Sequence, residues 1–549
     1  LGPTAMAPIH SKLNAVANAL DFSSPYIRFF RNVLFVLLVA KHGKVLLSKI
    51  LRDGIQKTIR DIFMSIGKVF FSVVKAAPGG QAVIQKEVNK VLKDLEHSLV
   101  PDRPGEIRYT SLPAEGLSAE KVRSEISRYK QMETVDYTAG KVSGTIYHDG
   151  NEELLALVSE AYTTFCSTNP LHPDVFPSIR KMDAEIVSMV VKMFNGSETA
   201  CGTTTSGGTE SILMACKAYR DLALEEKGIK EPEMIVPITG HAAFDKGSHY
   251  FGIKLIHVPV DEVTRKVDLT AMRNAITSNT VMLVGSAPSF PHGIIDDIEA
   301  IAQMGRERNI PVHVDACLGG FVVAFMEKAG FPLPRFDFRV PGVTSISCDT
   351  HKFGLAPKGS SVIMYSEKKY RSHQYFVAAD WTGGIYASPT LAGSRPGALL
   401  AGCWAAMVHM GEDGYVKSAR EIVSAARKIK EGINAIPNVF VYGDPLTCVV
   451  GFGSNTFDIY RVGNILTSKG WNLNSLQYPS SIHICVTRMN MKAADELVAD
   501  IREAVDEVMQ DPSKKLDGMG AMYGMAQSIP DRTIVDDIAR GYIDVLYKA

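Results

Sequence analysis

The chain has 549 residues, of which 46% are hydrophobic and 21% charged, and its 59 lysines and arginines balance 59 aspartates and glutamates. This length favours two or three folded units, and the balanced charge argues against a nucleic-acid partner, because such proteins usually carry a basic surplus. The eight scattered cysteines form no Cys-x-x-Cys pair, so neither a metal centre nor a thiol-redox motif is expected, and the pattern is typical of a reduced, cytosolic protein.

Residues 1–75 are predicted to form an apolar and basic membrane anchor. An uninterrupted apolar run occupies positions 33–40, inside a wider apolar window at 29–50. Since a spanning helix needs about 20 apolar residues, the run alone is short, and an interfacial or packing helix is the alternative. The flank after the run is rich in lysine and arginine, which would hold the C-terminal side in the cytosol.

The rest of the chain is predicted to form a linker and two domains. Residues 76–150 contain chain breakers at Pro78-Gly79-Gly80 and again between positions 101 and 113, which indicates a linker with a helical stretch. Residues 151–433 alternate apolar strand-like runs with helical stretches, which predicts an α/β domain with a mostly parallel sheet covered on both faces. Residues 434–549 contain shorter elements, typical of a smaller α+β domain. The strands expected in the large domain are 234–239, 255–260, 280–286, 311–314, 344–347 and 361–365.

Lys352 is the strongest single candidate for a reactive side chain. It closes the sequence Asp349-Thr350-His351-Lys352, which directly follows the expected strand 344–347. A lysine at a strand end, flanked by histidine and glycine, can point into the cleft at the edge where open α/β sheets bind ligands. The alternative is a solvated surface lysine.

Asp315 ends another apolar run and should lie at the same edge of the sheet. A carboxylate there could pair with the ring nitrogen of a pyridine cofactor and keep that nitrogen protonated. The alternative is an aspartate that caps a helix or a turn.

Two further segments complete the constellation. The sequence TSGGTES at 205–211 leads into a helical stretch, where backbone N–H groups and the helix dipole could hold a phosphate, although many Gly-Gly pairs are simple turns. It is not a Walker motif, because no Gly-Lys-Ser/Thr follows. His241 follows the expected strand 234–239 and could lie flat on an aromatic cofactor ring, or be an ordinary loop histidine.

The order of these features resembles the fold-type I pyridoxal-phosphate enzymes of the decarboxylase-like group. In detail it is similar to the sphingosine-1-phosphate lyase family, over roughly residue 140 to the C-terminus. The matching segments are NPLHPD at 169–174, TSGGTES at 205–211, HVDACLGG at 313–320, DTHK at 349–352, APKGS at 356–360, AGSRPG at 392–397 and GWNLN at 470–474.

The resemblance implies an enzyme that cleaves phosphorylated sphingoid bases, such as sphingosine 1-phosphate, into a long-chain aldehyde and phosphoethanolamine. Its pyridoxal 5'-phosphate would be carried on Lys352 as a Schiff base, and the enzyme would be a homodimer. One N-terminal helix would span the endoplasmic reticulum membrane, with the catalytic part facing the cytosol. The implied catalytic residues are Lys352, Asp315 and His241. The implied cofactor-binding residues are Gly208, Thr209, His241, Asp315, His351, Lys352 and Ser394, and Tyr147, Asn169, His172 and Lys358 would bind the substrate phosphate.

Two other functions fit parts of the sequence. An amino-acid decarboxylase on the same fold would need a cation for the substrate carboxylate, and Arg395 is a candidate. A membrane-associated scaffold without activity would be expected to have lost part of the cofactor set, yet Lys352, Asp315, His241 and the glycine loop are all present. The sequence does not identify the residue that removes the substrate hydroxyl proton, nor the preferred chain length.

Overall fold

A computed structural model describes residues 80–101, 106–514 and 532–549. Residues Ala82–Ala549 form one compact unit. The predicted membrane anchor at 1–75, with its apolar run at 33–40, lies outside the described residues. Among the helices that the structure does describe, none has the length and apolarity needed to cross a bilayer.

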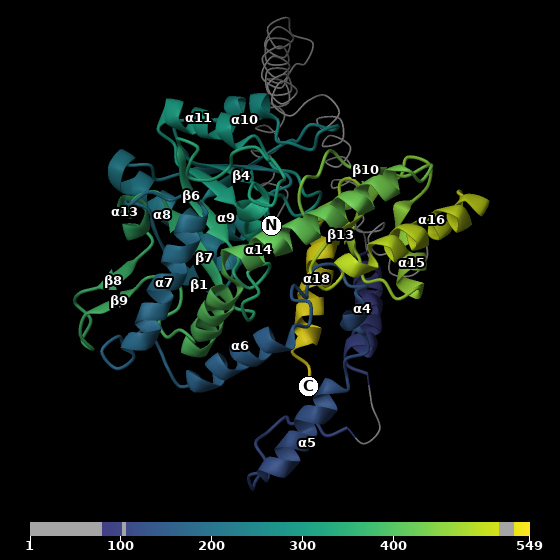
Figure 1. The fold of residues 1–549 in the computed structure, drawn as a ribbon, viewed down its shortest axis with the longest axis horizontal. Coiled ribbons are helices and arrows are strands. Elements are labelled where there is room, and N and C mark those ends of the chain that lie inside the picture. Colours follow the sequence, from purple (N-terminus) through teal and green to yellow (C-terminus); the bar gives the residue numbers. More distant parts are fainter. Residues whose placement is uncertain (1–79, 102–105, 515–531) are drawn as a thin grey trace, which may run out of the picture. The chain divides into compact units, whose positions relative to one another are not determined.

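Helices precede the central sheet along the chain (Figure 1). They are α4 (Gly80–Leu99), α5 (Ala119–Lys130), α6 (Glu152–Thr164) and α7 (Pro177–Met193). Polar caps and a proline fix where these helices start. The Ser118 hydroxyl accepts from Lys121 N at the start of α5, and the Asn151 side chain accepts from Leu154 N at the start of α6. Pro177 occupies the first turn of α7.

The central sheet has seven strands in the order β1-β7-β6-β5-β4-β2-β3. They are β1 (Cys201–Thr205), β2 (Glu233–Pro237), β3 (Lys254–Val258), β4 (Thr280–Ser286), β5 (Val312–Asp315), β6 (Val343–Cys348) and β7 (Ser361–Tyr365). The ladders that link β3, β2, β4, β5 and β6 are parallel, whereas β7 runs antiparallel to both β6 and β1. The prediction of a mostly parallel sheet is therefore confirmed.

Helices cover both faces of this sheet. They are α8 (Gly208–Lys227), α9 (Ala243–Phe251), α10 (Leu269–Ala275), α11 (Ile298–Arg308), α12 (Gly320–Met326), α13 (Lys368–Ser372) and α14 (Gly397–Asn434). Because successive side chains of a strand point to opposite faces of the sheet, one strand contributes side chains to two hydrophobic cores. Along β7, Val362 and Met364 belong to the larger core, and Ile363 and Tyr365 pack with residues of α8 and α9 in the second core. Strands buried on both faces explain the continuous apolar runs of the sequence.

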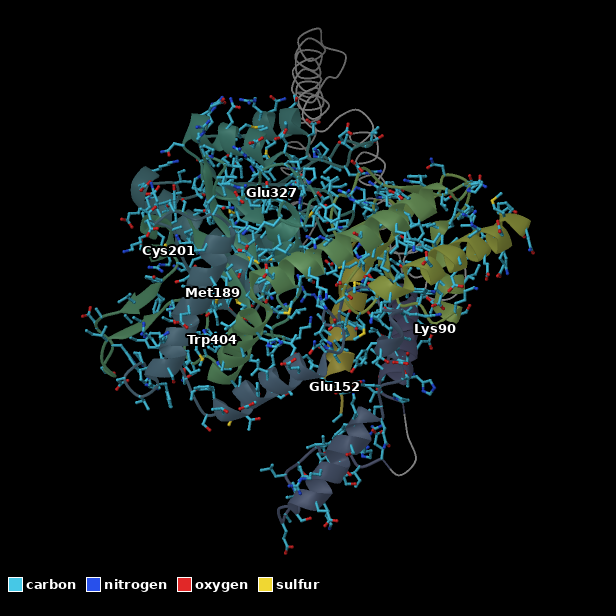
Figure 2. The ribbon with its side chains drawn as sticks, in the orientation of Figure 1. Lys90, Glu152, Met189, Cys201, Glu327 and Trp404 are labelled. Atoms are coloured by element: carbon cyan, nitrogen blue, oxygen red, sulfur yellow. The ribbon has the colours of Figure 1, made fainter. Side chains whose placement is uncertain are left out.

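The long helix α14 connects the central sheet to the C-terminal part of the chain. It packs on α6, α7, α12 and α16. Trp404 of α14 donates its indole N–H to Glu185 of α7. Figure 2 labels Trp404 and also Met189, which marks the position of α7. The helix is broken at Gly411, whose φ of 57° and ψ of −179° are non-helical and favour glycine.

A second, antiparallel sheet follows α14, with strand order β10-β11-β13-β12. Its strands are β10 (Phe440–Val441), β11 (Val449–Gly453), β12 (Asn474–Leu476) and β13 (Ser481–Cys485), with helices α15 (Ile459–Ser468), α16 (Ala494–Gln510) and α18 (Arg532–Leu546). A separate hairpin, β8 (Phe376–Ala378) and β9 (Tyr386–Ser388), precedes α14. Residues far earlier in the chain also join the second sheet. Gly144 N donates to Cys485 O, and Val142 forms a bridge with Asn472.

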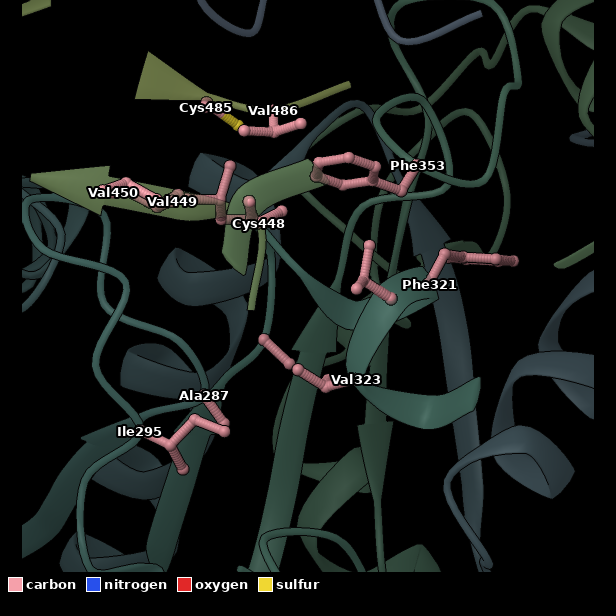
Figure 3. Close-up of a cluster of buried hydrophobic side chains, with 14 of the residues drawn as sticks. Ala287, Ile295, Phe321, Val323, Phe353, Cys448, Val449, Val450, Cys485 and Val486 are labelled. Atoms are coloured by element: carbon pink, nitrogen blue, oxygen red, sulfur yellow. The ribbon is translucent and has the colours of Figure 1, made fainter. Parts of the chain in front are cut away.

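Buried apolar side chains link the two sheets (Figure 3). Phe353 lies beside Phe321 of α12 and faces Cys448 and Val486 from the second sheet. Since Phe353 is the neighbour of Lys352, this packing fixes the turn that carries the predicted reactive lysine. The central sheet and the second sheet therefore both contribute to the position of Lys352.

Candidate active site

Four of the predicted site residues lie at or just after the carboxyl ends of strands of the central sheet, as open α/β sheets favour. Asp315 is the last residue of β5, and the turn that contains Lys352 follows β6 directly. Gly208 begins α8 after β1, and His241 follows β2. Strands β5 and β6 are neighbours, with Asp315 opposite Ser347.

Lys352 forms an ion pair with Asp349. The distance from Lys352 Nζ to Asp349 Oδ2 is 2.8 Å, and the lysine side chain is 21% exposed. Burial lowers the pKa of the Lys352 ammonium, but the negative charge of Asp349 outweighs this effect and leaves that pKa above its usual range. Lys352 is therefore an ammonium at neutral pH and must lose a proton before it can act as a nucleophile.

His351 is held between the backbone and Asp349. Ser360 N donates to His351 Nδ1 at 3.1 Å, so the proton of the neutral imidazole resides on Nε2. His351 Nε2 lies 3.6 Å from Asp349 Oδ2. Burial lowers the pKa of His351, so the ring is neutral at physiological pH. The Nε2 N–H of this ring therefore lies on the side of Asp349.

Asp315 belongs to a buried polar network. Cys317 N donates to Asp315 Oδ1 at 3.0 Å, and the Ser347 hydroxyl donates to the same oxygen at 3.4 Å. Ser347 Oγ in turn lies 3.1 Å from His313 Nε2. Asp315 Oδ2 makes no hydrogen bond with any residue that the structure describes. Oδ1 of Asp315 is therefore fixed, and Oδ2 is free to accept a hydrogen bond from a bound group.

The start of α8 has the properties of an anion site. Its N-cap residue, Gly207, makes no side-chain hydrogen bond into the first turn, and its φ of 155° lies in the range that favours glycine. A Cβ on Gly208 would lie 2.8 Å from both Cys317 Sγ and Asp349 Oδ1, so only glycine fits there. Thr209 follows and is half-buried. Together with the helix dipole, this turn suits a phosphate.

Lys358 and Tyr147 form a second polar pair beside Lys352. Lys358 Nζ lies 4.4 Å from the centroid of the Tyr147 ring, and that ring meets the edge of Phe353 at 4.9 Å. Burial raises the pKa of the Tyr147 phenol, which therefore stays protonated. Burial of the amine, followed by the charge on Lys352, lowers the pKa of Lys358 to about 8.

The other predicted residues form a looser group. Asn169 Oδ1 accepts from Leu171 N and from Arg395 N, which brings Asn169 and Ser394 into adjacent segments. Ser394, His172 and His241 are exposed. Ala243 N donates to His241 Nδ1, and neither His241 nor His172 makes a side-chain contact with another predicted site residue within the described chain.

The structure adds residues to which the sequence had assigned no role. Asp349 is the ion-pair partner of Lys352, and Phe353 packs on Tyr147. Glu210 accepts from Ser206 N and Leu391 N and so ties the glycine loop to the segment before Ser394. Of these residues, only Asp349 could have been predicted from the sequence, because an acidic residue three positions before a lysine can pair with that lysine in a turn.

Comparison with known proteins identifies the family. The profile of the pyridoxal-dependent decarboxylase conserved domain matches residues 122–454. Sphingosine-1-phosphate lyase 1 of Rattus norvegicus is 52% identical over 481 residues, which cover 87% of this chain and 84% of that protein. The chain belongs to the sphingosine-1-phosphate lyase family.

Other members of the lyase family agree with this assignment. Sphingosine-1-phosphate lyase of Saccharomyces cerevisiae is 48% identical over 86% of this chain and 81% of its own length. The solved structure of sphingosine-1-phosphate lyase from Burkholderia pseudomallei matches with a TM-score of 0.72 and 41% identity, over 74% of this chain and 95% of that one. A glutamate decarboxylase from Lactobacillus brevis shares the fold alone, with a TM-score of 0.64 and 18% identity.

The strand-end residues of this lyase fit pyridoxal phosphate. The uncapped start of α8 would hold its phosphate, the free oxygen of Asp315 its ring nitrogen, and Lys352 its aldehyde carbon. The carboxylate-binding role considered for Arg395 does not fit. Its guanidinium already pairs with Asp183 at 2.7 Å and donates to Thr204 at 3.0 Å.

Proposed function

We propose that this chain cleaves phosphorylated sphingoid bases, with sphingosine 1-phosphate as the reference substrate, into a long-chain aldehyde and phosphoethanolamine. The observation that carries the proposal is the position of the Lys358–Tyr147 pair next to Lys352. A cation at this place suits a phosphate at the end of the substrate, close to the amine that must react. The cation that a decarboxylase would use, Arg395, is instead neutralised by Asp183.

Pyridoxal phosphate supplies an electron sink for the bond that breaks between the second and third carbons of the substrate. Asp315 would hold the protonated ring nitrogen with its free oxygen, because Cys317 N and Ser347 fix the carboxylate through the other oxygen. His241, at the end of β2, would lie against the ring. Lys352 would hold the cofactor, and its amine, when not bonded to the cofactor, could carry protons.

Lys358 and Tyr147 would fix the substrate phosphate, and Asn169 and His172 are the further candidates for this role. Fixing one end of a flexible substrate would limit the orientations of its breaking bond relative to the cofactor, and such positioning is a large part of catalysis. A phosphate dianion beside Lys358 favours the ammonium form of that lysine and so strengthens its own binding.

The test is an assay with a phosphorylated long-chain base in which both products are identified by mass spectrometry. We expect equal amounts of a long-chain aldehyde and phosphoethanolamine. Release of carbon dioxide from an amino acid, without aldehyde from the phosphorylated base, would assign the chain to the decarboxylases instead.

A homodimer is proposed for the active form. Helix α5 has no buried residue and exposes Val122 and Ile126, and the β8–β9 hairpin exposes Phe376 and Val377, with Trp381 at its tip. Exposed apolar side chains on these two surface elements favour burial against another chain. The hairpin leads directly to Ser394, so a second copy that covers the hairpin would bring its own site close to this Ser394.

The cellular location is proposed from residues 1–75. The apolar window at 29–50 would form a single span of the endoplasmic reticulum membrane, and its basic flank would leave the catalytic part in the cytosol. A substrate with one long acyl-like chain resides in membranes, so an anchored enzyme would meet it there.

A further inference from the structure

Asp349 contacts two cationic or proton-bearing groups with one oxygen and none with the other. Its Oδ2 lies 2.8 Å from Lys352 Nζ and 3.6 Å from His351 Nε2. Its Oδ1 is buried and has no hydrogen-bond partner among the described residues, and the whole side chain is only 2% exposed. A buried carboxylate oxygen without a donor is unfavourable and calls for an explanation.

The unpartnered oxygen faces the first turn of α8. A Cβ placed on Gly208 would lie 2.8 Å from Asp349 Oδ1 and 2.9 Å from Oδ2. This turn begins a helix of 20 residues that has no side-chain cap, so its N–H groups favour a phosphate. A phosphate bound at this turn would be a neighbour of the carboxylate, and two neighbouring anions disfavour each other unless a proton lies between them.

We propose that Asp349 takes the proton of Lys352 when the cofactor binds and, as a neutral carboxyl, donates a hydrogen bond to the cofactor phosphate. The transfer converts the Lys352 ammonium and the Asp349 carboxylate into an amine and a carboxyl group, so no proton enters or leaves the site. The amine then condenses with the cofactor aldehyde, and one water is released. Asp349 is thus a positioning residue that prepares the nucleophile and accommodates the phosphate in one step.

The other titratable groups around Asp349 do not replace Lys352 as the donor. His351 is neutral, since burial lowers its pKa, and Cys317 is a thiol, since burial raises its pKa. Tyr147 stays a phenol for the same reason, and Asp315 is an acceptor fixed by Cys317 N. Lys358 is cationic but contacts His351 O and the Tyr147 ring rather than Asp349. Lys352 is the cation at hydrogen-bond distance.

The experiment compares the binding of two cofactor forms to four proteins, namely the wild type, Asp349→Asn, Asp349→Ala and a control variant. Dissociation constants for pyridoxal phosphate and for pyridoxal, which lacks the phosphate, are measured by absorbance titration of the full chain, with inorganic phosphate as a competitor. Substrate is absent, so the result does not depend on the proposed substrate. Asp349→Asn keeps a neutral donor and should retain the wild-type preference for the phosphorylated form. Asp349→Ala removes the donor and should lower that preference about tenfold, as expected for one hydrogen bond to a charged group.

The alternatives give different results. If Asp349 stays ionised beside the phosphate, both variants relieve repulsion and bind pyridoxal phosphate more tightly than the wild type, which overturns the proposal. If Asp349 only supports the fold, both variants lose affinity equally for the two cofactor forms, which also overturns it. Asp337→Ala is the matched control, because Asp337 is an equally buried acid that pairs with Arg339 away from the strand ends. Its preference between the cofactor forms should equal the wild-type value.

A second measurement tests the transfer of the proton from Lys352 to Asp349. Loss of the charge at position 349 should make Lys352 reactive at lower pH. The rate at which an amine reagent modifies Lys352, measured by mass spectrometry over a pH series, should therefore shift toward acid by at least one pH unit in Asp349→Asn. If the pH dependence of Lys352 modification is unchanged in a folded variant, the charge of Asp349 does not control the protonation of Lys352, which contradicts the proposal.

Discussion

The ammonium of Lys358 lies 4.4 Å from the centroid of the Tyr147 ring, so a cation rests on the face of a buried phenol. The phenol is uncharged, because burial raises its pKa, and the ring holds the lysine without neutralising it. The positive charge of Lys358 is therefore still available to a substrate phosphate. Substrate recognition should follow the protonation state of this one lysine.

The pH dependence of substrate recognition tests this relationship. Burial and the charge on Lys352 lower the pKa of Lys358 to about 8. The ammonium is present below that pH and is lost above it, so kcat/KM for the phosphorylated base should fall as the pH rises through about 8. Steady-state kinetics over a neutral-to-alkaline series measure the fall. Lys358→Arg should keep kcat/KM level, because a guanidinium stays charged. If the same fall persists in Lys358→Arg, another group is responsible.

Lys352→Ala should fold normally and yet lose all turnover. The side chain is the proposed attachment point of the cofactor, and removal of the amine also removes the partner of Asp349. Borohydride reduction of the wild-type holoenzyme, followed by peptide mass spectrometry, should locate the cofactor on Lys352. The visible absorbance band of the bound cofactor should be missing from the variant. Attachment to a different lysine would refute the assignment.

Asp315→Asn should retain some cofactor but lose most activity. The amide is nearly isosteric and can still accept from Cys317 N, but it carries no negative charge to keep the ring nitrogen protonated. Each ~1.4 kcal/mol of lost transition-state stabilisation lowers the rate about tenfold, and we expect a loss of one to several kcal/mol. Cofactor content and kcat are measured on the same sample. Near-normal kcat at full cofactor content would contradict the proposed ion pair between Asp315 and the ring nitrogen of the cofactor.

The sequence predicted the strand ends well, because apolar strands buried on both faces leave a clear pattern. Asp315 and Lys352 follow such runs and lie where expected. The direction of β7 was not predictable, since the pattern of residues 361–365 is the same for a parallel and an antiparallel neighbour. Strand β1 was not predicted at all, because Cys201–Thr205 is small and polar rather than apolar.

Contacts between distant segments were beyond sequence reasoning. Arg395 looked available for a carboxylate until the structure placed Asp183 beside it, 212 residues away in the chain. Residues 142–144 lie in a segment interpreted as a linker, yet Ser143 and Gly144 hydrogen-bond to Cys485 of the second sheet. Such pairings depend on tertiary packing, and no local pattern encodes them.

The homodimer proposal predicts complementation between two inactive variants. Lys352→Ala and Ser394→Ala are purified separately, mixed, and allowed to exchange subunits. If Ser394 serves the site of the partner, each mixed dimer contains one site with both native residues, and activity should return. Native mass spectrometry verifies the mixed species. No recovery in verified mixed dimers would mean that Ser394 serves its own subunit.

Membrane attachment should be separable from catalysis. The apolar run lies at positions 33–40, whereas every proposed site residue lies at or beyond Tyr147, and the proposed site is built within the unit Ala82–Ala549. A chain that starts near Lys75 should therefore be soluble, bind the cofactor and cleave a short-chain or detergent-dispersed substrate, because the sequence Pro78-Gly79-Gly80 predicts a domain boundary and truncation at such boundaries is tolerated.

The full chain should behave differently. It should sediment with membranes and resist extraction by carbonate or high salt, since a spanning helix is held by its apolar surface, whereas an interfacial helix is released by such washes. Immunoblots of the pellet and supernatant decide between the two. Release of intact protein by carbonate would exclude the span and favour the interfacial helix. A truncated chain that binds no cofactor would show instead that residues before Lys75 are needed for the catalytic fold, for example through the proposed dimer.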